Sequence, residues 1–383
     1  MTFTRQLVTL IVATLPWGVR ERYREEWLAD LDGAAELGIP TGAVVRGAAV
    51  TALTLDRADS ATSGMPRLDL ARRRGRWAAA FGSSAIILGA GTLFTGGLRS
   101  FERERIAGGA ALAAVGTGLE VAAVVLGALA LVFAVGAVAV GGLPMRRLAG
   151  AVLLLVAVGA AAALNPVALV MVALPVAAFL SLAVLTGEGR PAPRRLRIAV
   201  GTTIAVAALA FVALTVVRIA VWNPLARAPG LTLDQIYTEM VQANQLSPAA
   251  GTFLAAWAAV WAVVALALPI ACLVPAAAGW FTLRRLAVVG CAMLGLIIAT
   301  SWIAGFGIGM ALADTFLTSG GDATIGGAVL TVAGQLALAA TPLIALAPAR
   351  PHTAAPAAVA WRAKPARATR RVRPRSSLRA ARP

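Results

Sequence analysis

Long apolar segments constrain this chain more than any other feature of its sequence. Eight are long enough to cross a bilayer, and in lipid each must be helical, because unpaired backbone groups there are energetically costly. Soluble domains carry about 25% charged residues, whereas this chain has 13% charged and 59% hydrophobic residues. The sequence therefore predicts an all-α, polytopic membrane helix bundle. The predicted spans are Trp77–Gly97, Val121–Val140, Leu148–Leu164, Pro166–Leu185, Ile198–Val217, Phe253–Ala276, Leu286–Ala311 and Ile325–Ala347.

Basic residues predict how this bundle is oriented. If the N-terminus is inside, the predicted inner segments hold 29 of the 34 basic residues. An excess of arginine on the inner side is the pattern of the positive-inside rule. We therefore predict that both termini are cytoplasmic. The Ala-, Val- and Arg-rich composition favours the inner (plasma) membrane of a bacterium. The predicted outer arginines are Arg99, Arg103, Arg105, Arg218 and Arg227.

Composition divides the chain into three predicted regions. Residues 1–76 form a cytosolic or interfacial region of amphipathic helices, residues 77–348 form the transmembrane domain, and residues 349–383 form a basic tail. The tail carries ten basic residues and no acidic one, so we predict that it is disordered. We expect it to bind anionic lipids of the inner leaflet. We expect no nucleic acid to bind, because Trp361 is the tail's only aromatic residue.

Similar sequences at the starts of predicted spans favour an internal duplication. Pro144–Gly150 resembles Thr282–Gly290, and Arg74–Ser84 resembles Arg195–Thr203. A duplication would make spans one to four superpose on spans five to eight, with the halves related by an axis along the membrane normal. The alternative remains open that membrane orientation alone places arginines at these span starts.

Two outer connections are predicted to be helical. We expect Phe101–Gly118 to form a surface helix that leads into the second span. In the other connection, Thr232 and Gln235 form a capping box, and Pro248 is expected to end the helix. This helix is predicted to be amphipathic and to cover the ends of the spans, although a lid or a docking surface remains an alternative. Its apolar stripe comprises Leu233, Ile236, Tyr237, Met240 and Val241.

The charged segment Leu15–Leu31 stands out from the apolar remainder of the chain. Tyr23, Trp27 and Leu31 recur at helical spacing and form one apolar stripe. A Gly-Ile-Pro sequence ends this helix, and a second weakly amphipathic helix is expected at Val44–Leu55. The apolar run before the segment is too short to span a bilayer. We therefore predict a small helical hairpin ahead of the first span.

The same segment resembles a known prefix. Arg22-Tyr23-Arg24-Glu25-Glu26 and Leu28-Ala29-Asp30-Leu31, followed by an apolar helix, are similar to the N-terminal prefix of some bacterial ABC-type permeases and of related actinobacterial multi-pass membrane proteins. The resemblance covers about 45 residues. The rest of the chain departs from those permeases, because it has no large extracytoplasmic domain between spans. The resemblance therefore implies no export activity and no catalytic residues.

The sequence offers no constellation of residues that supports catalysis. The single histidine, His352, lies in the basic tail, so a nucleophile paired with a histidine base is not expected. No grouping of His, Cys, Asp and Glu suggests a metal site. We therefore predict no enzymatic activity, no metal and no cofactor. Gly305, Gly309 and Ala313 recur every four residues and predict a small helix face that another helix approaches closely.

A few polar residues near the spans are the candidates for function. Glu120, Arg218 and Asp314 fall near the predicted outer ends of spans, and Gln335 lies deeper. An ionisable residue within the hydrocarbon is a functional candidate by default. We expect these three charges, however, to reach the interface and be solvated there.

Two functions remain open from the sequence. The first is a membrane protein without catalytic chemistry, acting as a scaffold or a regulatory partner of another membrane protein through its charged ends. The second is a transporter or permease-like protein for a small or amphiphilic solute. Eight spans and the prolines Pro175, Pro269, Pro275 and Pro342, which are expected to break helices, favour transport, whereas scarce polar residues oppose it. A polar-lined cavity at mid-depth would favour the second function, and a solid bundle the first.

Overall fold

The computed structural model describes residues 3–56, 59–63, 65–94, 98, 108–141 and 191–348. These described residues are helical or connect helices, and no strand occurs among them. The predicted third and fourth spans and the basic tail lie outside the described residues. The predicted duplication involves those two spans, so it stays a prediction.

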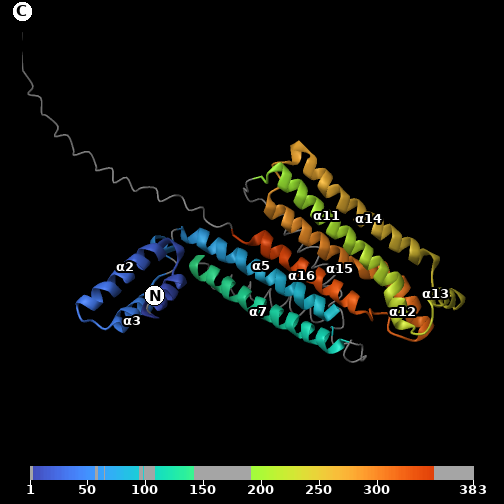
Figure 1. The fold of residues 1–383 in the computed structure, drawn as a ribbon, viewed down its shortest axis with the longest axis horizontal. Helices are drawn as coiled ribbons and strands as arrows, with labels where there is room; N and C mark the ends of the chain where they lie inside the picture. The colour runs from blue at the N-terminus through green and yellow to red at the C-terminus, as the bar shows by residue number, and fades with distance from the viewer. Residues whose placement is uncertain are drawn as a thin grey trace, which may run out of the picture. The chain divides into compact units, whose positions relative to one another are not determined.

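Three N-terminal helices pack against one another around a small core. They are α1 (Phe3–Thr14), α2 (Trp17–Glu36) and α3 (Thr41–Thr54), and the short helix α4 (Ser60–Ser63) follows. Figure 1 shows these N-terminal helices side by side. The core consists of apolar residues from the three longer helices and the connection between α1 and α2. Its buried residues are Val8, Val12, Leu15, Trp27, Leu31, Ala48 and Ala52.

The structure confirms the stripe of α2 and corrects the predicted hairpin. Trp27 and Leu31 are buried, and Tyr23 is half-buried, as helical spacing predicts. The short apolar run is not an isolated segment, because it forms α1 and inserts Val8 and Val12 into the same core. The region is therefore a group of three packed helices. Helix α1 contributes to the core that buries the apolar stripe of α2, so α2 and α3 alone would leave part of that core uncovered.

Five described helices are long and apolar enough to cross a membrane, and they identify the chain as a membrane protein. A further helix, α5 (Arg67–Phe94), contains most of the predicted first span. The five are α7 (Gly109–Gly141), α11 with its continuation (Arg194–Arg227), α14 (Pro248–Leu273), α15 (Leu283–Phe316) and α16 (Ile325–Leu346). They correspond to the predicted second, fifth, sixth, seventh and eighth spans. The count of eight and the cytoplasmic termini stay predictions.

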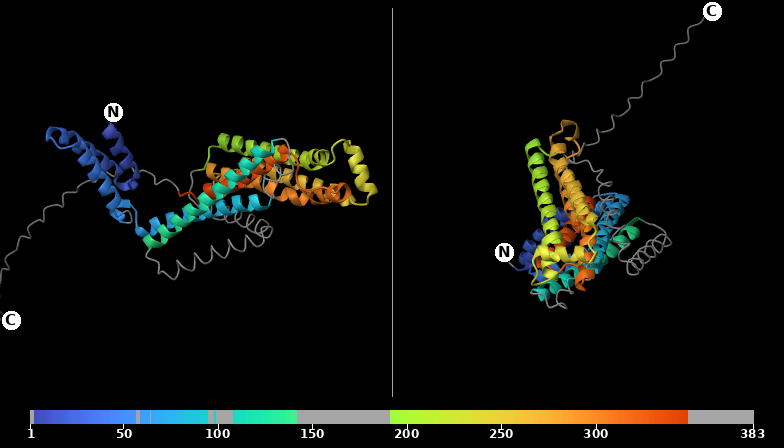
Figure 2. Two further views of the ribbon diagram at one scale, coloured as in Figure 1. Left: turned by 90° about the horizontal axis from the view of Figure 1, so that it is seen from below. Right: turned by 90° about the vertical axis from the view of Figure 1, so that its right-hand side faces the viewer.

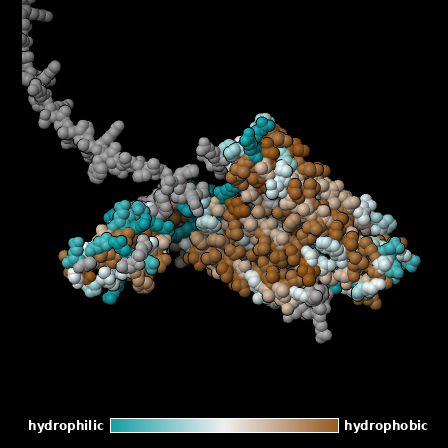
Figure 3. Space-filling model, in the orientation of Figure 1, coloured by the Kyte–Doolittle hydropathy of each residue, from teal (hydrophilic) through white to brown (hydrophobic). Residues whose placement is uncertain are grey.

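Each of these helices packs against one or more of the others, so that together they form one continuous group. Helix α5 lies against α7 on one side and α16 on the other, α16 lies against α15, and α15 contacts both α11 and α14. Figures 1 and 2 both show α11 beside α14 and α5 beside α7. Hydrophobic residues cover the visible surface of these helices, whereas hydrophilic ones gather on the N-terminal helices (Figure 3). Exposed valines on α14, such as Val260 and Val263, suit a surface in contact with lipid.

Two expectations about helix boundaries are wrong. The stretch from Gly109 to Gly118 does not form a separate surface helix, because it is the first part of the continuous helix α7. Pro269 and Pro342 do not break their helices, since α14 and α16 continue through them. Both prolines remove one backbone donor, and the remaining hydrogen bonds and packing of a long helix tolerate this loss.

Arginines at the starts of three helices hold the ends of their neighbours. Each lies near the start of α5, α11 or α15 and donates to a carbonyl near the end of α7, α14 or α16. The last four carbonyls of a helix lack intrahelical donors, so the guanidinium groups at Cys272 and Ile344 satisfy groups that would otherwise be unpaired, whereas Gly136 lies before the last four residues of α7. The bonds join Arg74 Nη1 to Gly136 O (3.0 Å), Arg197 Nε to Cys272 O (2.8 Å) and Arg284 Nε to Ile344 O (2.8 Å).

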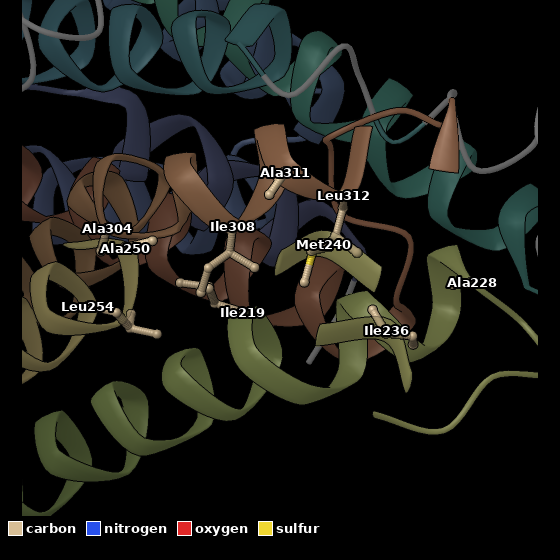
Figure 4. Close-up of a cluster of buried hydrophobic side chains, with 10 residues drawn as sticks. All are labelled: Ile219, Ala228, Ile236, Met240, Ala250, Leu254, Ala304, Ile308, Ala311 and Leu312. Atoms are coloured by element: carbon tan, nitrogen blue, oxygen red, sulfur yellow. The ribbon is translucent and has the colours of Figure 1, made fainter. Parts of the chain in front are cut away.

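The amphipathic helix α13 (Leu233–Gln242) packs over the end of α15. Its capping box is present, because Gln235 N donates to Thr232 Oγ1 (3.3 Å) and Thr232 N donates to Gln235 Oε1 (2.8 Å). Ile236 and Met240 are fully buried, beside Leu312 of α15 (Figure 4). The predicted cover over the span end is confirmed for this stripe, although Val241 is exposed.

The predicted end of this helix is wrong. Helix α13 ends at Gln242, and Asn244 adopts a positive φ of 55°. Pro248 instead occupies the first position of α14, where a missing N–H costs nothing because that group has no helical acceptor.

Replacing Thr232 with alanine tests the cap of α13. The change removes the side-chain acceptor of the Gln235 N–H and should cost about 1 kcal/mol of local stability. We expect faster amide hydrogen exchange throughout α13 in the purified protein. Thr238→Ala, at an exposed position inside the same helix, is the control and should not accelerate exchange. Equal exchange in both variants would show that burial of Ile236 and Met240 alone holds the helix.

Candidate binding cavity

The structure brings two of the four predicted polar residues together and leaves two apart. Arg218 and Gln335 line the same cavity. Glu120 is half-buried on α7, and Asp314 is exposed on α15; neither lines this cavity. Asp314 is accessible, and its solvation stays a prediction, whereas the same expectation fails for Arg218, which is only 9% exposed.

The cavity has a volume of about 540 Å³ and lies among α5, α15, α16 and the continuation of α11. One part of its wall is polar, and another is apolar. Cavities of about 300–1,000 Å³ with a mostly apolar wall and a few polar groups are typical of small-molecule sites. The polar wall includes Arg218, Asn223, Ser301, Asp322, Thr331 and Gln335, and the apolar wall includes Ile298, Trp302, Phe306 and Leu338.

Arg218 is held by two side chains. Its Nη1 donates to Asp322 Oδ2 at 3.3 Å, and its Nη2 donates to Ser301 Oγ at 2.9 Å. Ser301 in turn donates to the carbonyl of Ile298 at 2.7 Å. A charge removed from water needs such partners, because burial of an unpaired ion is costly. This arrangement was not expected from the sequence, because Arg218 was predicted to reach the membrane interface and be solvated there.

A π-helical turn positions Arg218. This turn, η2 (Arg218–Trp222), separates α11 (Arg194–Val217) from α12 (Asn223–Arg227). Single π-helical turns within α-helices occur frequently at functional sites. Pro224 has no N–H for the carbonyl of Ala220, four residues earlier, and the hydroxyl of Tyr237 donates to that carbonyl instead, at 3.0 Å. Burial raises the pKa of Tyr237, so its hydroxyl stays protonated and able to donate.

Asp322 connects this turn to the start of α16. Its Oδ1 accepts hydrogen bonds from the backbone N–H (2.9 Å) and the hydroxyl (2.8 Å) of Thr324, while its Oδ2 faces Arg218. Asn223 strengthens the connection, because its Oδ1 accepts from the N–H of Ala323 at 3.0 Å. The two carboxylate oxygens of Asp322 therefore have different tasks: one orders the helix start, and the other pairs with the buried cation.

Neighbouring atoms approach the small face on α15 closely, from a side chain at Gly305 and from a backbone carbonyl at Gly309. A side chain at Gly305 would meet Ile219 at 3.2 Å, and one at Gly309 would meet the carbonyl oxygen of Gly320 at 2.9 Å. The predicted close approach is confirmed at Gly305, where the neighbour is the π-helical turn. At Gly309 the neighbour is the connection between α15 and α16, so the expectation of a helix there is wrong.

Gln335 fixes one wall of the cavity. Its Nε2 donates to the carbonyl of Leu88 at 2.7 Å, across the interface between α16 and α5. A side chain at Gly91 would collide with this amide, at 2.1 Å. Ser84 supports the same interface, since its hydroxyl donates to the carbonyl of Ala339 at 2.7 Å. The bond from Gln335 to Leu88 orders this wall of the cavity. Gly91 leaves room for the Gln335 amide in this position, because it has no Cβ.

The charges that line the cavity do not balance. Arg218 and Arg227 are cationic, and Asp322 is the one acidic residue among the lining residues described. Arg227 donates through Nε to the carbonyl of Gly321 at 3.1 Å, which fixes the same connection that carries Asp322. The described lining therefore has an excess of one positive charge.

Sequence reasoning missed Asp322 and Asn223. A usable signal was present for Asp322, because the order Asp322, Thr324 and an apolar run resembles a helix start, where a carboxylate is favourable. The short connection before it also limits how far Asp322 can lie from the outer end of a span. Nothing comparable marked Asn223, whose role depends on the π-helical turn.

Known proteins do not assign this cavity. Comparison of the chain with protein-family models, curated proteins and solved structures finds no match. The resemblance of the N-terminal segment to a permease prefix therefore stays a prediction. Within the described ranges, no group of three or more His, Cys, Asp and Glu residues could hold a metal ion.

Proposed function

We propose that the protein binds a small amphiphilic solute in the Arg218 cavity, in the manner of a transporter or permease-like protein. The observation that carries the proposal is a buried cation in the wall of a cavity that is otherwise largely apolar. Charged residues within membrane segments are rare, and they commonly mark pathways or binding sites of solutes and ions. We propose no catalytic step, and the scarcity of polar residues suits recognition of an amphiphile rather than of a polar solute.

The cavity supports solute binding over the scaffold function that the sequence also left open. A scaffold needs no cavity beside a buried arginine, whereas a solute-binding protein does. Action through the charged ends remains compatible with this proposal. We propose that the N-terminal helices contact a partner membrane protein, that the basic tail contacts anionic lipids, and that the protein resides in a bacterial inner membrane.

Photo-crosslinking of the purified protein in nanodiscs tests the proposed function. The probes are medium-chain amphiphiles that carry a diazirine on the chain, used with a carboxylate or a neutral alcohol as head group. At least one probe should label peptides that contain Trp302 or Phe306, because both side chains line the cavity. Labelling should saturate with probe concentration and fall when excess unlabelled amphiphile is added.

A pair of variants on α15 shows whether the cavity is the site. Ala299→Phe adds bulk to the cavity wall and should abolish most of the saturable labelling. Ile303→Phe adds bulk at an exposed position of the same helix that does not line the cavity, so it should leave labelling intact. Gel filtration checks that both variants fold. Labelling that does not saturate, or that Ala299→Phe leaves unchanged, would contradict the proposed function.

A further inference from the structure

The chemistry of the cavity limits the head group of its ligand. This inference rests on the proposed function and deepens it. The described lining carries two guanidinium groups and one carboxylate, so a ligand with one negative charge would balance it. A cationic head group would instead be repelled by the two guanidinium groups, which is unfavourable.

Arg218 retains donors for such a ligand. An arginine has five N–H donors, and within the described residues Arg218 uses two of them, one for Asp322 and one for Ser301. The planar guanidinium suits carboxylates and phosphates, which it binds with paired hydrogen bonds. Arg218 is fixed by the π-helical turn and by Ser301, so little conformational freedom is lost when an anion binds.

The carboxylate of Asp322 already pairs with Arg218, so it would compete with an anionic ligand for this guanidinium group. Its contact with Arg218 is long, at 3.3 Å, and its side chain is 24% exposed, whereas that of Arg218 is 10% exposed. The other oxygen of the same carboxylate is held by Thr324 at 2.8 and 2.9 Å. Asp322 can therefore yield Arg218 to an incoming anion without losing the bonds that order the start of α16.

The apolar wall specifies the remainder of the ligand. Trp302 and Phe306 lie on α15 close in sequence to Ser301, and Ile298 lies one turn before Trp302. The hydroxyl that holds Arg218 and the apolar wall therefore lie on one helix. A single molecule can contact both, with its charged end at Arg218 and its chain along the aromatic residues.

We propose that the ligand is an amphiphile with one anionic head group, which binds Arg218 in exchange for Asp322. The shared chemistry is a carboxylate or a phosphate on a hydrocarbon chain, from a free fatty acid or from a lipid head group. In the predicted orientation the connection that carries Asp322 lies on the outer side, so the ligand enters from the outer leaflet.

Head-group competition tests this proposal in the nanodisc assay described above. Four probes share one chain and carry a carboxylate, a phosphate monoester, a neutral alcohol or a trimethylammonium group. We expect the anionic probes to label the cavity at concentrations about tenfold lower than the neutral probe, because hydrogen bonds between charged groups are the stronger ones. Nanodiscs with and without anionic phospholipid separate the two sources, since only a lipid ligand competes with the probe when it is supplied in the membrane.

Two variants assign the preference to Arg218 and its exchange with Asp322. Asp322→Asn keeps the oxygen that accepts from Thr324 but removes the competing charge, so it should tighten binding of the anionic probes several-fold. The double variant Arg218→Gln with Asp322→Asn removes both charges together and leaves no unpaired ion, so it should fold and should lose the preference for anions. Binding of the neutral probe should change little in either variant.

The outcomes separate this proposal from the proposed function. Equal labelling by all four probes would overturn the anionic ligand, and unchanged preference in the double variant would overturn its binding to Arg218. Either result would leave a solute-binding cavity in place. Weaker anion binding in Asp322→Asn would overturn the exchange and identify the pair as structural only. Failure of every probe to label the cavity would overturn both proposals.

Discussion

Replacing Gly295 with alanine should destabilise the packing of α15 on α16 by about 1–3 kcal/mol, the cost typical of an overpacked core. An added Cβ would lie 2.5 Å from Leu338 Cβ and 2.9 Å from the Cα and N atoms of the same residue. Backbone atoms cannot rotate away as a side chain does, so the two helices would have to separate. The contact is reciprocal, because a Cβ at Gly334 of α16 would lie 2.5 Å from Ile298 of α15.

Unfolding of the purified protein in increasing sodium dodecyl sulfate measures this effect. Gly295→Ala should unfold at a lower detergent fraction than the parent protein. Gly118→Ala on α7 is the matched control, because a Cβ there has no atom within 4 Å. Alanine has a higher helix propensity than glycine, so this control variant should be as stable as the parent protein or more stable by up to about 1 kcal/mol. Equal behaviour of the two variants would mean that α15 and α16 do not pack this closely.

Replacing Arg197 with methionine should cost about 2–3 kcal/mol, although it removes only one of the arginines in the first turn of α11. Arg197 is 5% exposed, and it donates to the carbonyls of Cys272 (2.8 Å) and Ala278 (3.4 Å). Without Arg197, the carbonyl of Cys272 at the end of α14 and the carbonyl of Ala278 beyond it lose this donor in a place that water reaches poorly. Buried acceptors without a partner carry the desolvation cost in full.

The variant Arg195→Met separates the effect of losing a positive charge from the effect of losing the hydrogen bonds that Arg197 makes to the carbonyls of Cys272 and Ala278. Arg195 lies two residues earlier on the same helix and is exposed. Both variants remove one positive charge from the same predicted inner connection, so membrane orientation should respond equally. Only Arg197→Met should lower the sodium dodecyl sulfate fraction at which the protein unfolds. If both variants unfold alike, these arginines act through charge alone, and the capping bonds contribute nothing measurable.

Helix type and helix position were readable from the sequence because both follow from local composition. Runs such as Phe253–Ala276 must be helical in lipid whatever they pack against, and the structure has α14 there. The capping box at Thr232 and Gln235 was equally local, since three residues of backbone suffice to form it. Boundaries set by longer patterns were less secure, as the continuous helix α7 shows.

Helix packing could not be read from these apolar segments. Nearly every face of a membrane helix is hydrophobic, so amphipathic periodicity does not mark the side that faces a neighbour. Gly295 and Gly334 differ from Gly118 through Leu338 and Ile298, which lie on the opposite helices. A sequence shows a glycine, whereas the tertiary structure shows what approaches it.

The sequence by itself determined that this chain is a helical membrane protein, and it selected Arg218 as one of few polar candidates. Only the tertiary structure decided that Arg218 is buried, because its partners Ser301 and Asp322 lie 83 and 104 residues further along the chain. Charge and hydropathy are properties of single residues and can be summed along a segment. Burial depends on which distant segments close around a residue, and here the close approach of η2, α15 and the start of α16 turned an arginine expected at the interface into the cation of a cavity.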